Sequence, residues 1–94
     1  MRRYPSFEEY LDESLKDPQH AADYLNAIIE EDPSLLPVAL ADVARAHGVS
    51  KFAKMASISR VGLYKSLSPK GNPGLQTLLG ILKASGLRLS FTRA

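Results

Sequence analysis

The chain has 94 residues, 45% of them hydrophobic, and a formal net charge of +2, which predicts a single globular domain over residues 1–94 and argues against a disordered chain. It has no cysteine, which excludes disulfides and thiolate metal sites, and no apolar run approaches the roughly 20 residues that span a bilayer. The basic start is followed by acidic residues instead of an apolar segment, so we expect no signal peptide and a cytoplasmic protein.

Two helices are predicted in the acidic N-terminal part of the chain, residues 1–33. Ser6 is the expected N-cap of the first, whose apolar stripe is Phe7, Tyr10, Leu11 and Leu15. Asp17 and Pro18 predict the start of the second helix, because Asp favours the N-cap and proline the first helical position. The buried face of that helix is expected at Tyr24, Leu25, Ile28 and Ile29.

Residues 34–86 are expected to form the core of the domain. A third helix is predicted from about residue 35 to residue 47, with Ser34 as its N-cap and Gly48 ending it. A last helix is predicted to begin at Pro73, directly after the cap residue Asn72, and to end before Gly86.

Between these helices, residues 50–67 have the layout of a helix-turn-helix, with a short helix, a tight turn and a second short helix. Ser57 occupies the turn position where a positive φ favours glycine, and Ser59 is the expected N-cap of the second helix. With Leu63 and Leu67 facing the core, the outward side chains of the second helix are Arg60, Val61, Tyr64 and Lys65. A plain helical hairpin would show the same pattern.

The tail, residues 87–94, changes from a helical period to strict alternation. Its apolar residues Leu87, Leu89 and Phe91 predict a short half-buried β-strand. Because the chain shows no second strand, this strand would pair with a partner chain, either another copy or a different protein. The alternative is a frayed tail with its leucines resting on the core.

Charge is strongly divided along the chain. All ten acidic residues lie within residues 1–42, whereas residues 43–94 hold nine basic residues and no acidic one. A surface of one sign attracts a partner of the opposite sign, and for the basic part the expected polyanion is double-stranded DNA. A solvated surface without a partner would also fit the charge pattern taken alone.

These features assign roles to the residues of the helix-turn-helix. The expected base-reading residues are Ser59, Arg60, Val61, Tyr64 and Lys65. The expected phosphate contacts are Ser50 at the start of the first helix, Lys51, Lys54, Lys70 and Asn72. Gly62, inside the second helix, is either tolerated there or permits close approach to DNA.

Several segments together resemble the addiction-module antidote proteins, which are small antitoxins with a lambda-repressor-like DNA-binding domain. They are Asp42–Ser50, Ile58–Arg60, Leu63–Ser68, Gly71–Pro73 and Gly86–Ser90. The resemblance runs from about Tyr10 to Leu89, with Ser57 and Gly62 as departures from the family pattern. The expected fold is therefore all-α, a lambda-repressor-like helix-turn-helix domain of five or six helices with a short C-terminal β-strand.

The resemblance implies a dimer that binds an operator, represses its own operon and neutralises a cognate toxin, typically a small basic ribonuclease. A basic toxin would find a complementary surface on the acidic part of the chain. The candidate contacts are Glu8, Glu9, Asp12, Glu13, Asp23, Glu30, Glu31 and Asp32. These carboxylates would equally serve as a solvated helix surface.

Catalysis is not expected, because His20 and His47 lie far apart and no phosphate-binding glycine loop is present. We expect no enzyme, no cofactor, no metal, no membrane association and no small-molecule substrate. Two alternatives to the antitoxin stay open: a stand-alone repressor of phage type without a toxin, and a protein-interaction module that does not bind DNA.

Overall fold

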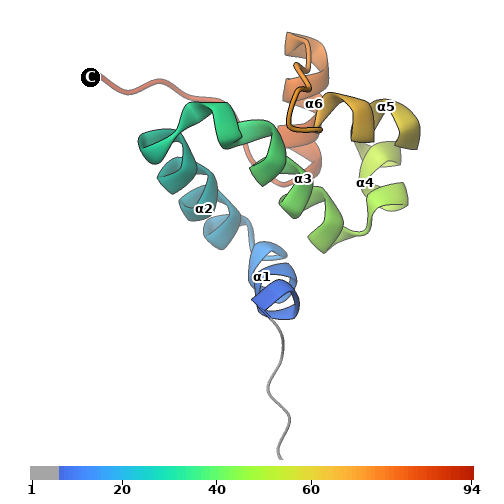
Figure 1. Cartoon of the computed structure of the whole chain (residues 1–94), viewed down its shortest axis with the longest axis horizontal. Helices are drawn as coiled ribbons and strands as arrows, with labels where there is room; N and C mark the ends of the chain where they lie inside the picture. The colour runs from blue at the N-terminus through green and yellow to red at the C-terminus, as the bar shows by residue number, and fades with distance from the viewer. Residues whose placement is uncertain (1–6) are drawn as a thin grey trace, which may run out of the picture.

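The computed structural model describes residues 7–94, except for the side chain of Glu8, and this part of the chain is all-helical (Figure 1). The expected Ser6 cap lies outside the described residues. The elements in chain order are α1 (Phe7–Leu15), α2 (Pro18–Glu31), the 3-10 helix η1 (Pro33–Leu35), α3 (Leu36–His47), α4 (Val49–Met55), α5 (Arg60–Ser66) and α6 (Leu75–Ala84). None of these helices combines the length and the hydropathy needed to cross a bilayer.

Helix α3 occupies the centre of the molecule (Figure 1). It packs against α1 and α2 on one side and against α4 on the other, and α4 in turn packs against α5 and α6. One continuous core joins these helices, and its largest fully buried side chains come from α1, α3, α4, α5 and α6: Leu15, Leu40, Val43, Phe52, Leu63 and Ile81. The acidic helices α1 and α2 therefore lie across α3 from the two helices of the helix-turn-helix segment.

The start of α2 is confirmed, whereas the start of α3 differs from the prediction. Asp17 Oδ1 accepts hydrogen bonds from the backbone N–H groups of Gln19 at 2.8 Å and His20 at 3.4 Å. Before α3, Asp32 takes the capping role expected of Ser34, because its Oδ1 accepts from both the N–H and the hydroxyl of Ser34. These two hydrogen bonds stabilise the 3-10 helix η1, and α3 begins directly after η1, at Leu36.

The start of α6 is also later than predicted. The helix begins at Leu75 after Gly74, so Asn72 and Pro73 are not its N-cap and first residue. A Cβ on Gly71 would overlap the carbonyl oxygen of Ser66, which shows how closely the loop passes the end of α5. The loop must clear α5 before a new helix can form, and residues 71–74 have no regular secondary structure.

The end of α6 is confirmed, but the predicted C-terminal strand at Leu87, Leu89 and Phe91 is wrong. Gly86 has φ 77°, its N–H donates to the carbonyl of Lys83, and the next N–H donates to that of Leu82, a pair of bonds typical of a helix end. Residues 87–94 then form no strand. Alternation makes a segment two-faced, but a strand also requires a neighbouring strand for its backbone hydrogen bonds, and residues 7–86 offer none.

Candidate nucleic-acid interface

Helices α4 and α5 lie where the helix-turn-helix pattern predicted two short helices, joined by residues 56–59. The N-cap of α5 is Ser59, as expected, and its Oγ accepts from the N–H of Gly62 at 2.9 Å. Leu63 is 2% exposed, so α5 is held on the core by the expected residue. Ser50 was expected to cap α4, but the helix begins two residues earlier, at Val49 with Gly48 at φ 87° as its N-cap, so Ser50 lies inside the helix.

The connection between α4 and α5 depends on an unusual backbone conformation at Ser57. Its φ is 58°, the positive value that the pattern predicted at this position. The N–H of Ser57 donates to the carbonyl of Lys54 at 3.2 Å, and the N–H of Ile58 donates to that of Ala53 at 3.0 Å. These bonds close the C-terminus of α4 in the same way that Gly86 closes α6. A serine therefore adopts a conformation that glycine adopts without strain.

Gly62 has a structural reason for being small. A Cβ at this position would lie 3.0 Å from the capping hydroxyl of Ser59 and 3.2 Å from a side-chain carbon of Ile58. The absence of a side chain therefore lets the cap and the residue after the turn pack against the first turn of α5.

The four side chains expected on the outer face of α5 are all exposed: Arg60, Val61, Tyr64 and Lys65. Arg60 does not extend freely from this face. Its Nη1 donates to Ser50 Oγ at 3.3 Å, and its guanidinium carbon lies 5.7 Å from the centroid of the Tyr64 ring. The link between Arg60 and Ser50 joins α5 to α4, and no sequence pattern indicates a bond between residues ten positions apart.

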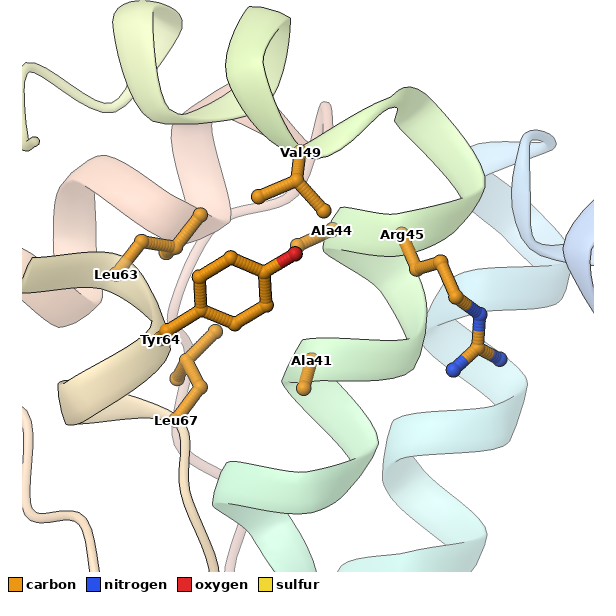
Figure 2. A pocket seen from close by; sticks show the side chains of 7 residues that line it. All are labelled: Ala41, Ala44, Arg45, Val49, Leu63, Tyr64 and Leu67. Atoms are coloured by element: carbon orange, nitrogen blue, oxygen red, sulfur yellow. The ribbon is translucent and has the colours of Figure 1, made fainter. Parts of the chain in front are cut away.

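Tyr64 is anchored over a small apolar pocket of about 120 Å³ between α3, α4 and α5. Figure 2 shows its ring among Leu63, Leu67 and Val49, while the side chain of Arg45 extends away from the ring. The residue is 54% exposed, so part of the phenol remains accessible to solvent although the ring lines the pocket. This anchoring leaves the ring fewer orientations than a fully exposed side chain has.

The expected phosphate contacts on α4 and in the loop before α6 are exposed as well: Lys51, Lys54, Lys70 and Asn72. Together with burial, Lys51 also lowers the pKa of His47, a residue for which no functional role was predicted. The His47 ring packs against Phe52, and its Nε2 is buried with no hydrogen-bond partner among residues 7–94. Burial lowers the pKa of His47 below its usual value, and the positive charges of Lys51 and Lys16 lower it further.

One of the acidic residues expected to contact a toxin is instead part of a structural network. Asp12 Oδ1 accepts from Nε of Arg45 at 3.1 Å, and Nη1 of Arg45 lies 3.3 Å from Asp42 Oδ1. The hydroxyl of Tyr24 donates to the other oxygen of Asp42 at 2.7 Å. Burial and the hydrogen bond to Asp42 raise the pKa of Tyr24 to about 12. This network joins α1, α2 and α3, so the carboxylate of Asp12 is already engaged within the chain.

The other acidic candidates with described side chains are exposed on α1, α2 and the turn after α2: Glu9, Glu13, Asp23, Glu30, Glu31 and Asp32. Glu13 pairs with Lys16 at 3.2 Å, and Asp23 accepts a hydrogen bond from Gln19 at 3.0 Å. Within residues 7–94, no group of three carboxylates or histidines is arranged to hold a metal ion.

Comparison with known proteins identifies the family. A family model described as "Probable addiction module antidote protein" matches residues 6–93. An uncharacterised protein of Haemophilus influenzae is 48% identical over 66 residues, which cover 69% of this chain and 68% of that protein. No solved structure matches the chain. The chain therefore belongs to the family of addiction-module antidote proteins, and membership implies an antidote role with a cognate toxin as partner.

Proposed function

We propose that this antidote protein is a sequence-specific DNA-binding dimer that represses its own operon and neutralises a small basic ribonuclease toxin. The observation that carries the DNA-binding proposal is the exposed face of α5, with Arg60, Val61, Tyr64 and Lys65 beside the lysines of α4. A lambda-repressor-like domain would place such a helix in the major groove, where these side chains read base edges.

Charge supports this choice of partner. The part of the chain that contains α4, α5 and α6 has nine basic residues and no acidic one, so no carboxylate of residues 43–94 opposes an approaching phosphate backbone. Lys51, Lys54 and Lys70 are exposed around α5 and would position the protein on the backbone, while Arg60 and its neighbours read sequence.

The toxin is proposed to bind on the other side of α3. The exposed carboxylates of α1, α2 and the turn after α2 give that side a negative charge, which complements a basic partner. Because Asp12 is held by Arg45, it is a weaker candidate than Glu30, Glu31 and Asp32 for direct toxin contact.

A gel-shift titration with the DNA upstream of the gene, at two salt concentrations and with scrambled competitor DNA, tests DNA binding. If a dimer neutralises about six phosphates, the logarithm of the affinity falls with the logarithm of salt at a slope near −5. A shift that survives the competitor supports the operator proposal. Binding that does not depend on salt would contradict it and favour a protein-interaction module.

Two variants separate base reading from positioning. Arg60→Ala is expected to weaken the binding free energy at the operator by about 1–3 kcal/mol and to relax the sequence preference. Lys51→Ala is expected to weaken binding to all sequences alike. Identical behaviour of the two variants would show that these roles are wrongly assigned. Copurification of a small basic protein encoded beside the gene would distinguish an antitoxin from a stand-alone repressor.

A further inference from the structure

An apolar groove of about 280 Å³ lies between α2, α3, α6 and the first residues of the tail. Leu25 and Ile29 of α2, Leu40 of α3 and Leu82 of α6 are among its lining residues. An apolar cavity of roughly 150 Å³ in another protein is large enough to bind benzene. The groove therefore has room for the ring of a phenylalanine side chain.

The tail, residues 87–94, carries such a ring at Phe91, and the side chain of Phe91 has almost no contact with the rest of the chain. Leu87 packs on the core and Leu89 lines the groove, but Phe91 is 91% exposed. Figure 1 shows the tail running past the connection between α2 and α3 and then away from the helices. In an extended chain, alternate residues share one face, so Phe91 and Arg93 would face the same surface as Leu89.

Charge at the end of α2 complements the tail. Glu30, Glu31 and Asp32 follow Ile29 directly, and the last turn of α2 contains no basic residue. Carboxylates are unfavourable at the C-terminus of a helix, where the dipole favours a positive charge. The tail contains Arg88 and Arg93 and no acidic residue. If the phenyl ring of Phe91 lay near Ile29, Arg93, two residues further along the tail, would place a positive charge beside these carboxylates.

We propose that two copies of this chain exchange their tails, so that Phe91 of each copy occupies the groove of the other and Arg93 lies against the partner's Glu30 and Glu31. The inference rests on the proposed dimer and names its interface. The exchange is symmetric, because the tail and the groove belong to the same surface of the chain and each copy both gives and receives a tail.

Single cysteines test the exchange directly, because the natural chain has none. Ile29→Cys and Phe91→Cys chains are prepared separately at full length, mixed and oxidised. A covalent one-to-one dimer on a non-reducing gel is expected from the mixture and not from either chain oxidised alone, because the mixed disulfide requires the tail of one copy to reach the groove of another. The matched control replaces Ile29→Cys with Leu75→Cys, an exposed apolar position on α6 that does not line the groove, and should give no covalent dimer.

Sedimentation velocity over a concentration series tests the same interface without cysteines. Phe91→Ser and Arg93→Glu should each weaken the dimer at least about tenfold, and Glu30→Lys with Glu31→Lys should restore dimerisation to the Arg93→Glu chain. Lys54→Glu serves as the charge control and should leave the dimer unchanged. Because Phe91 is so exposed, its replacement leaves the core intact.

The outcomes separate the interface from the dimer. If the natural chain is dimeric and the Phe91→Ser and Arg93→Glu chains are equally dimeric, the tail exchange is wrong and the proposed dimer stands. A natural chain that is monomeric throughout overturns both. If a monomeric chain instead loses toxin binding on Phe91→Ser, the groove belongs to the toxin and the exchange is wrong.

Discussion

The backbone of Gly80 in α6 packs directly on the carbonyl oxygen of Ala56, at the start of the connection between α4 and α5. A Cβ built on Gly80 would lie 2.8 Å from that oxygen. The atom in the way is backbone, which cannot rotate aside as a long side chain can. The position of the turn before α5 therefore depends on a glycine in a helix that is not itself part of the helix-turn-helix segment.

We predict that Gly80→Ala destabilises the protein by up to about 2 kcal/mol. Overpacking costs about 1–3 kcal/mol and outweighs the gain of about 1 kcal/mol in helix propensity. Urea unfolding followed by circular dichroism measures the change. Gly74→Ala is the matched control, because a Cβ there meets nothing within 4 Å, and its effect should stay within about 0.5 kcal/mol. An equally stable Gly80→Ala chain would show that α6 shifts without cost.

Ser57→Gly is predicted to stabilise the protein by about 0.5–1 kcal/mol. A residue with a Cβ at positive φ destabilises the fold by about 1–2 kcal/mol, and glycine removes this cost. The greater conformational freedom of glycine in the unfolded chain offsets roughly half of that gain. Ser57→Ala keeps the Cβ at φ 58° and should bring no gain. Urea unfolding compares the free energy of unfolding of both variants with that of the natural chain. If Ser57→Ala stabilises the protein as much as Ser57→Gly does, the effect comes from loss of the hydroxyl and not from the backbone conformation.

The helices could be predicted because their signals are local. Asp17 with Pro18, Ser59, Gly48 and Gly86 each act on backbone groups within a few residues, and the helix ends they indicate are those observed. The errors came where two local signals compete or where a distant segment intervenes. Asp32 and Ser34 both suit an N-cap, and only the folded turn shows that the carboxylate accepts from the serine.

The candidate site could be predicted only as a set of exposed residues. Period and charge identified the outward face of α5, but they do not indicate that Arg60 contacts Ser50 or that Tyr64 rests on a pocket formed with α3. Similarly, Asp12 and Arg45 are 33 positions apart, so their ion pair follows from the packing of α1 on α3. Contacts of this kind depend on the tertiary arrangement, which periodicity does not encode.

Tyr24→Phe is predicted to cost about 1 kcal/mol of stability, because Asp42 loses its hydrogen-bond donor in a partly buried network. The pKa of Tyr24, raised to about 12, lies above the usual value near 10, so the folded protein keeps a proton that the unfolded chain loses. The stabilising contribution is complete below about pH 10 and is lost as pH rises toward 12. Ultraviolet titration of tyrosinate should show a late-titrating phenol that Tyr24→Phe removes. Unchanged titration in that variant would contradict the assignment.

His47 provides a probe of phosphate binding that is independent of affinity. Its pKa is lowered, so the folded protein disfavours the charged ring, and stability should fall as pH decreases below the unfolded value of about 6.5. Lys51→Ala removes one of the positive charges and should raise the pKa of His47, which NMR titration of the ring carbons measures. Operator DNA should raise it too, because a phosphate against Lys51 offsets the charge of the lysine. A pKa that rises in Lys51→Ala but is unchanged by bound DNA would place the phosphate backbone away from the start of α4.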